Sequence, residues 1–150
     1  IRELRMSRGL GDVYKRQGIG FVAFSPLANG LLSKCYNTES IFDTQTDYRA
    51  AMPQYQKDSF EKNKCLFEMI EQLAMEKHAT PAQISLAWMM SKKPWIVPIP
   101  GTRCLCRLKE NIGAADISFS QEEVAAIDKL LSTMEMSEVF GGSRIVDKAQ

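Results

Sequence analysis

The chain has 150 residues, of which 45% are hydrophobic and 25% charged, values typical of one globular domain or part of one. Its formal net charge of +1 gives no reason to expect nucleic acid or an anionic membrane surface as a partner. No apolar run approaches the ~18 residues of a membrane-spanning helix, and no secretory signal pattern is present. These features favour a cytoplasmic location without a membrane partner.

The first 17 residues, IRELRMSRGLGDVYKRQ, differ in character from the rest. They hold five of the nineteen basic residues and two of the eighteen acidic ones, and they show no helical or strand periodicity. The run SRGLGDVYKRQ resembles the peptide encoded by a sequencing-library adaptor, whereas a basic arm for nucleic acid is the functional alternative. We predict that residues 1–17 are non-native and that natural sequence begins near Gly18, without its true N-terminal part.

The apolar run from Ile19 to Phe24 predicts a parallel strand buried on both faces. Residues 28–58 are rich in Asn, Thr, Ser, Asp and Gln and predict a long irregular loop, which is more often functional than idle. Residues 59–77 predict a helix that ends at His78, an exposed or capping residue.

The second half predicts a helix, a strand and two further helices. The helix at 80–93 carries a capping box in Thr80 and Gln83. A short strand at 95–99 is limited by its prolines, and a helix over 102–114 follows. The last helix, at 120–132, starts from a second capping box, and the alternation indicates an α/β fold with parallel strands.

Two arginines mark the start of the expected helix at 102–114. On a helical wheel Arg103 and Arg107 share one face with Glu110 and Asn111. Three apolar residues, Leu105, Leu108 and Ile112, lie on the opposite face, which we expect to pack against the sheet or barrel. The polar face suits an adenosine 2′-phosphate and its adenine, because guanidinium groups bind phosphate bidentately and stack on planar rings. The alternative is a solvated face with an Arg107–Glu110 ion pair.

The spacing of the four cysteines predicts neither a metal site nor a disulfide framework. Cys35, Cys65, Cys104 and Cys106 form no CxxC pair, and the single histidine, His78, offers no zinc spacing, so no metal site is expected. Cys104 and Cys106 are too close in sequence to staple a fold. We therefore expect four free thiols in a reducing compartment.

Two segments, GIGFVAFSPLANGLLS and IVPIPGTRCLCRLKENIGAADISFSQEEVAAID, resemble the C-terminal half of the aldo-keto reductases, in the bacterial branch related to potassium-channel β subunits. The resemblance covers residues 18–140 and implies a (β/α)8 TIM barrel, present here in part. Residues 18–24 would form its seventh strand and residues 95–99 its eighth. The cofactor implied is NADP(H), bound at the carboxyl ends of the strands.

The resemblance also assigns cofactor-binding residues. The family's pyrophosphate loop matches Ser25, Pro26, Leu27 and Gly30, and its 2′-phosphate and adenine site matches Gly101, Thr102, Arg103, Arg107, Glu110 and Asn111. Arg49 matches a position that closes over the pyrophosphate. One departure is Ser33-Lys34-Cys35, which shifts by one residue a lysine that the family places after the loop glycine. The catalytic Asp, Tyr, Lys and His lie on earlier strands, so no catalytic residue is assigned here.

The intact parent is expected to be an NADPH-dependent reductase of aldehydes or ketones. Its expected partner is a small-molecule carbonyl substrate, in a pocket shaped by the 28–58 loop and the tail around Phe140. A nucleotide-sensing or interaction subunit with little turnover is the alternative, and an inactive fragment is a third. The sequence determines neither the carbonyl substrate nor the oligomeric state.

Overall fold

The computed structural model describes residues 18–137, so the segment 1–17 and the tail around Phe140 lie outside the described residues. Two strands, β1 (Phe21–Phe24) and β2 (Ile96–Ile99), pair in parallel, with Phe21 opposite Ile96 and Phe24 opposite Ile99. The predicted strands are therefore confirmed, with slightly shorter bounds. Because parallel neighbours need a crossover, the connecting helices lie between them in sequence.

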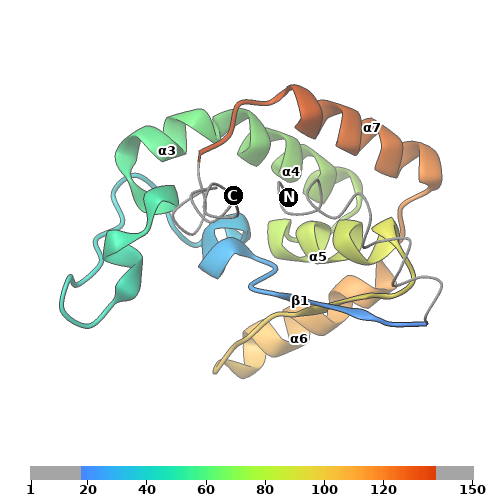
Figure 1. Cartoon of the computed structure of the whole chain (residues 1–150), viewed down its shortest axis with the longest axis horizontal. Helices are drawn as coiled ribbons and strands as arrows, with labels where there is room; N and C mark the ends of the chain where they lie inside the picture. The colour runs from blue at the N-terminus through green and yellow to red at the C-terminus, as the bar shows by residue number, and fades with distance from the viewer. Residues whose placement is uncertain (1–17, 138–150) are drawn as a thin grey trace, which may run out of the picture.

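The central helix is α5 (Pro81–Lys92), which contacts α4 (Lys64–Glu76), β2, α6 (Leu105–Gly113) and α7 (Gln121–Thr133). Figure 1 shows α5 between the strands and the pair formed by α4 and α7. The predicted capping boxes are confirmed, since Thr80 and Ser120 each accept a hydrogen bond from the backbone N–H three residues later. These two helices begin where their local signals place them.

The main core lies between α4, α5 and α7. Its most buried members include Ile84 and Ala87 on α5, with exposed fractions of 2% and 1%. The remaining buried members are Leu66, Ile70, Ala74, Phe119, Val124, Ile127 and Leu131. These apolar positions recur at helical spacing, so burial of one stripe per helix joins the three helices.

The predicted helix over 59–77 is two helices, α3 (Lys57–Lys62) and α4, which meet at Asn63. Asn63 is 2% exposed, and its amide bonds the distant Ser137 twice: Nδ2 donates to Oγ at 2.8 Å, and Oδ1 accepts from the backbone N–H at 3.0 Å. Its backbone departs from helical geometry, with ψ at 1°. The helix is therefore interrupted at Asn63, where this residue contacts Ser137, and the spacing of apolar residues in the sequence does not predict the interruption. After α4, His78 is exposed with φ 51°, and its N–H closes the helix on Met75, as a capping residue does.

The 28–58 segment is more ordered than predicted. It contains three 3-10 helices, η1 (Ala28–Ser33), η2 (Tyr48–Ala51) and η3 (Pro53–Tyr55). Around buried Leu31, Tyr55 and Phe60 it forms a second core, joined by Tyr36 and Phe42, which we call the aromatic cluster. Edge-to-face contacts connect Tyr55 with Tyr36 and Phe42, and a tilted contact connects Tyr36 with Phe42, at 4.8–5.6 Å between ring centroids.

The sheet is covered on one face only within the described residues. Ala23 and Ile96 are buried, whereas Val22, Phe24, Val97 and Ile99 on the other face are each more than half exposed. The expectation of a strand buried on both faces is therefore wrong for residues 18–137, because the side chains on this second face are mostly exposed. Among these residues, none of the helices has the length and apolar character needed to span a bilayer.

Candidate cofactor site

The two predicted cofactor segments leave the sheet at the same edge. Phe24 and Ile99 are the last residues of parallel, register-matched strands, so Ser25 and Gly101 follow neighbouring carboxyl ends. Figure 1 shows the two strands side by side with their following segments at one end. Ligands of α/β proteins bind at this edge, outside the carboxyl ends of the strands.

The segment after β1 has an unusual backbone. Ser25, Ala28 and Asn29 have φ values of 47°, 50° and 60°, and Gly30 has 100°. Positive φ is uncommon in residues other than glycine, and such conformations gather at functional sites when surrounding contacts maintain them. The hydroxyl of Ser25 donates to Asn29 Oδ1 at 3.0 Å, and the Asn29 carbonyl accepts from the Tyr55 hydroxyl at 2.9 Å. Side-chain hydrogen bonds thus hold the segment that the resemblance assigns to pyrophosphate, residues 25–30, in one conformation. We call this segment the locked turn.

Arg49 is held by protein groups. Its Nε donates to Asp47 Oδ1 at 2.8 Å, another guanidinium nitrogen donates to the Tyr36 hydroxyl, and its Cζ lies 4.7 Å and 4.8 Å from the ring centroids of Tyr36 and Phe42. The side-chain hydrogen bond from Arg49 lowers the pKa of Asp47. The structure therefore places this arginine against the aromatic cluster. Sequence reasoning missed Asp47 and Tyr36 as its partners, although the Asp-x-Arg spacing is a local turn signal.

The helix after β2 starts later than predicted. Helix α6 begins at Leu105 with Cys104 as its extended N-cap, so the expectation of a helix from 102 is wrong by three residues. Arg103 consequently lies outside the helix and does not share a helical face with Arg107. Both arginines are exposed, and none of the ion pairs within residues 18–137 involves either of them.

The polar residues further along α6 are less exposed. Glu110 and Asn111 are half-buried, and the Glu110 backbone carbonyl accepts a hydrogen bond from Gln83 Nε2 at 3.0 Å. This bond ties α6 to α5 while leaving the Glu110 carboxylate without an ion-pair partner among the described residues. The alternative Arg107–Glu110 pair is therefore not among the ion pairs of this structure.

The apolar face of α6 is open. Leu105, Leu108 and Ile112 are 66%, 44% and 64% exposed, and no residue of the helix is buried. The expectation that this face packs against the sheet or barrel is wrong for the described residues. The helix contacts α5 through Glu110 and Gly113, which lie against Gln83, whereas the face with the leucines is largely exposed.

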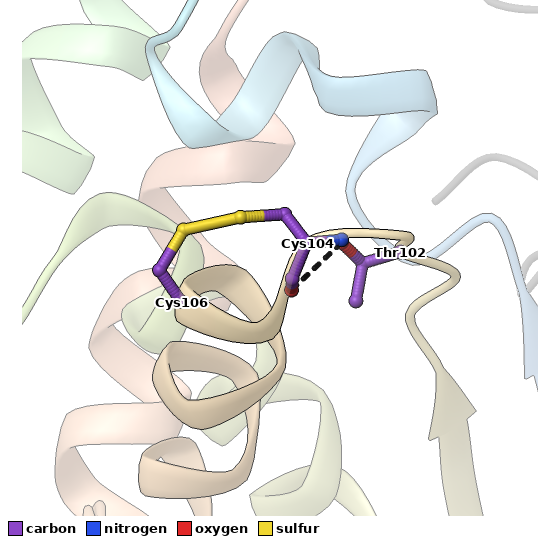
Figure 2. Close-up of a disulfide and its surroundings, with 3 residues drawn as sticks. All are labelled: Thr102, Cys104 and Cys106. Atoms are coloured by element: carbon purple, nitrogen blue, oxygen red, sulfur yellow. Dashed lines mark hydrogen bonds between the residues drawn. A yellow bond between two sulfur atoms is a disulfide. The ribbon is translucent and has the colours of Figure 1, made fainter.

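Two of the four cysteines are joined. Figure 2 shows Cys104, before α6, bonded to Cys106 on its first turn, with the Thr102 hydroxyl beside them. The expectation of four free thiols is therefore wrong for this pair and confirmed for Cys35 and Cys65. The Cα atoms lie 5.5 Å apart, within the usual range for a disulfide, because the chain turns from extended to helical between the two residues.

The predicted cofactor residues differ in exposure: Gly101, Arg103 and Arg107 are exposed, Pro26 is buried, and the others are half-buried. One hollow of about 190 Å³ lies between Leu31, Tyr36 and Phe60, and another of about 590 Å³ lies beside Lys62, Cys65 and Met134. Neither hollow is lined by a predicted cofactor residue. A Cβ added at Gly101 would meet no atom within 4 Å, so the surroundings of this glycine leave room for a ligand. Within residues 18–137 no cluster of three or more potential metal ligands occurs.

Comparison with known proteins agrees with the resemblance. The model of the aldo/keto reductase family matches residues 3–132. Similar proteins include the aldo-keto reductase str7 of Strobilurus tenacellus, 37% identical over 125 residues, and the aldo-keto reductase yakc [NADP(+)] of Schizosaccharomyces pombe, 34% identical over 133 residues. These alignments cover 83% and 89% of the chain but only 37% and 38% of those proteins. The chain thus spans less than two fifths of the length of these relatives.

Solved structures give the fold. The thermostable aldo-keto reductase Tm1743, in complex with the inhibitor epalrestat, is 29% identical with a TM-score of 0.52, over 81% of this chain and 33% of that one. The glycerol dehydrogenase AKR11B4 from Gluconobacter oxydans is 24% identical with a TM-score of 0.67, over 81% of this chain and 36% of that one, and supports the fold alone. Together they imply a (β/α)8 barrel of which residues 18–137 form a partial α/β unit. The chain belongs to the aldo/keto reductase family.

Proposed function

We propose that the protein is an NADPH-dependent reductase of aldehydes or ketones, and that this chain is its cofactor-binding C-terminal part. We place it in the bacterial branch related to potassium-channel β subunits, on the two segments quoted above. The observation that carries the proposal is the shared carboxyl edge of β1 and β2, from which both cofactor segments leave. The NADP(+) in the name of the yeast relative supports the choice of cofactor.

The residues present suit a phosphate. Lys34, Arg49, Lys77 and Lys92 each pair with a carboxylate, whereas Arg103 and Arg107 have no such partner among the described residues. Unpaired guanidinium groups beside a helix start are the groups that bind a phosphate dianion well. The donor set therefore fits the 2′-phosphate that distinguishes NADP(H) from NAD(H).

Each segment has a role in this proposal. Arg103 and Arg107 would hold the 2′-phosphate, while Glu110 and Asn111 would bond the adenine amine. The locked turn from Ser25 to Gly30 would support the pyrophosphate, with Arg49 at its side. The bound cofactor would supply hydride to the carbonyl carbon of the substrate. The proton donor to the carbonyl oxygen would come from residues outside this chain.

The open apolar surfaces support the view that more of the protein packs here. The exposed sheet face holds Val22, Phe24, Val97 and Ile99, a pattern that fits the interior of a barrel. Since the relatives are more than twice as long as this chain, we propose that the missing strands cover that face. The residues 18–150 alone would then be inactive.

The first experiment replaces Arg103 by alanine in the full-length protein, with Lys109→Ala, an exposed cation six residues later on α6, as the control. A lost charge-assisted contact is worth about 1.5–3 kcal/mol, so NADPH affinity should fall about 10- to 100-fold. Isothermal titration with NADPH and NADH measures both affinities. Equal losses for the two cofactors would contradict a 2′-phosphate role, and a comparable loss in Lys109→Ala would mean a general charge effect.

A turnover assay separates the reductase from the alternative. The full-length protein with NADPH and a panel of aldehydes should consume cofactor in proportion to aldehyde. Tight NADPH binding without turnover would instead support the nucleotide-sensing or interaction subunit. Sequencing the source DNA upstream of the Gly18 codon also tests the reductase proposal, because a reductase requires an open reading frame that encodes the earlier strands and their catalytic residues.

A further inference from the structure

We propose that Cys104 and Cys106 form a reversible dithiol–disulfide pair that sets where α6 begins, and thereby whether Arg103 and Arg107 act together on one anion. The pairing and the helix start follow from the described geometry. The consequence for the anion rests on the proposed function, because it concerns the 2′-phosphate of NADP(H). No assignment for these cysteines follows from family membership.

Helix geometry makes the disulfide and a longer helix mutually exclusive. Successive helical residues are rotated by about 100°, so residues two apart point to nearly opposite sides and cannot join their side chains. The bonded pair therefore requires one cysteine outside the helix. Cys104 meets this requirement with φ −107° and ψ 126°, and the first helical hydrogen bond runs from Leu108 N–H to the Cys104 carbonyl at 3.0 Å.

The residues before α6 are already suited to a longer helix. The Thr102 hydroxyl accepts a hydrogen bond from the Cys104 N–H at 3.1 Å. This is the bond that an N-cap makes to the second residue of its helix. Figure 2 shows the Thr102 side chain beside Cys104. If Thr102 were the N-cap, the helix would start at Arg103, within one residue of the predicted start at 102. The disulfide is the feature of the structure that holds Cys104 extended instead.

The position also suits thiol chemistry. Both cysteines are exposed, and arginines flank them in sequence at 103 and 107. Thiolates, which perform disulfide exchange, are stabilised by helix N-termini and by neighbouring arginines. By contrast, the loop that the bond closes holds only three residues, so it constrains the unfolded chain far less than a long-range disulfide would. Local control of the backbone conformation therefore explains this disulfide better than stabilisation of the whole fold does.

The redox step balances with a small disulfide as oxidant. One cysteine thiolate attacks oxidised glutathione, forming a mixed disulfide and releasing one reduced glutathione. The second cysteine then displaces the other glutathione and forms the Cys104–Cys106 bond. The pair loses two electrons and two protons in total, and oxidised glutathione becomes two molecules of reduced glutathione. Excess reduced glutathione reverses both steps.

Reduction should bring the arginines together. Once Cys104 is free to become helical, Arg103 and Arg107 are four residues apart on one helix and lie on the same face. Two guanidinium groups can then bind one phosphate, whereas the oxidised chain holds Arg103 outside the helix. We therefore expect the reduced protein to bind NADPH about tenfold more tightly than the oxidised one, the equivalent of one charge-assisted contact. NADH, which lacks the 2′-phosphate, should change much less.

The test begins with the thiols of the full-length protein equilibrated in glutathione buffers. Alkylation and peptide mass spectrometry should show Cys104 and Cys106 changing together. A Cys35→Ser/Cys65→Ser variant, which lacks the free thiols of the described residues, should retain this transition. Absence of a bond between Cys104 and Cys106 under oxidised glutathione would overturn the proposal at this stage.

The second measurement follows the helix start by NMR. On reduction the Arg107 amide should gain a helical hydrogen bond to the Arg103 carbonyl, so its hydrogen exchange should slow and the carbon shifts of Arg103 and Cys104 should become helical. The control is Cys104→Ala/Cys106→Ala, because serine would itself cap the helix whereas alanine favours helix. This variant should match the reduced protein in every buffer. An unchanged helix start would overturn the switch.

Binding completes the test and separates the two proposals. A redox shift in NADPH affinity that disappears in Cys104→Ala/Cys106→Ala supports the inference. An equal shift for NADPH and NADH overturns the link to the 2′-phosphate. If neither cofactor binds in any buffer while the helix start still changes, the proposed function fails and the structural switch stands.

Discussion

Replacing Gly30 by alanine tests whether the locked turn after β1 depends on a residue without a side chain. Gly30 has φ 100°, and a Cβ there would lie 2.9 Å from Tyr36 Cε2, closer than real Cβ atoms approach. The ring cannot simply move away, because Tyr36 packs against Phe42 and Tyr55 at 5.3 Å and 5.6 Å, and Arg49 lies over it. The substitution therefore combines backbone strain with overpacking.

The two effects can be given magnitudes. A left-handed backbone costs an L-residue about 1–2 kcal/mol, and overpacking a filled site costs about 1–3 kcal/mol. We therefore expect Gly30→Ala to lower the free energy of unfolding by about 2–5 kcal/mol. A small protein with a urea dependence of about 2 kcal/mol/M would show a midpoint lower by about 1–2.5 M, and the longer full-length protein should show a smaller shift because this dependence grows with size.

Urea unfolding of the full-length protein, followed by circular dichroism, measures this change. Gly101→Ala is the matched control, because its Cβ would meet nothing within 4 Å and its φ is not in the left-handed range, so it should change stability by less than about 1 kcal/mol. In a Tyr36→Ala background, Gly30→Ala should lower the free energy of unfolding only by the cost of the left-handed backbone, about 1–2 kcal/mol. A Gly30→Ala midpoint equal to the wild type would refute the reasoning from both φ and the aromatic cluster.

Three further predictions concern a helix end, an ion pair between helices and the aromatic cluster. His78 occupies a left-handed position with φ 51° after α4, so His78→Gly should raise the free energy of unfolding by about 1 kcal/mol in urea titrations, and a loss would show that the imidazole has a needed contact. The side-chain hydrogen bond from Lys77 to Glu123, at 2.6 Å, lowers the pKa of Glu123 below its ordinary 4.5. The contribution of this ion pair to the free energy of unfolding is therefore present above pH 4.5 and is lost as the pH falls. The stability gap between wild type and Glu123→Gln should accordingly shrink on acidification, and a gap independent of pH would contradict the ion pair. Burial raises the pKa of Tyr55 above its ordinary 10.0, so stability should fall as the pH rises past about 10, because the unfolded tyrosine ionises first. Tyr55→Phe should cost about 1 kcal/mol through the lost bond to Asn29 and flatten this alkaline loss, as measured by thermal unfolding across pH; an unaltered alkaline loss would point to another group.

Short stretches of sequence were enough to predict most of the helices and both strands. Thr80 with Gln83 and Ser120 with Glu123 form capping boxes, and each helix begins at the residue after its cap because the interaction spans only three residues. The apolar runs at 19–24 and 95–99 are short and bounded by turn residues, so their strand assignment also needed no distant contact. The two quoted segments indicated the aldo/keto reductase family, and the comparison confirmed it.

Contacts between distant residues decided the rest. Asn63 separates α3 from α4 and bonds Ser137, 74 positions away, a partner that no helical periodicity can reveal. Arg49 lies on Tyr36 because the loop folds back on its own aromatic rings. The predicted roles of the cofactor-binding residues stay predictions until binding is measured.

The start of α6 shows the boundary between the two kinds of information most clearly. The sequence by itself determined an amphipathic helix after β2 with arginines at its beginning, because periodicity and charge are local properties. Only the tertiary structure decided that Cys104 is extended and bonded to Cys106, and that Leu105 and Ile112 are largely exposed. The physical reason is that a pattern gives the face of a helix but not what lies against it. A covalent bond between two side chains can override the backbone conformation that the pattern favours.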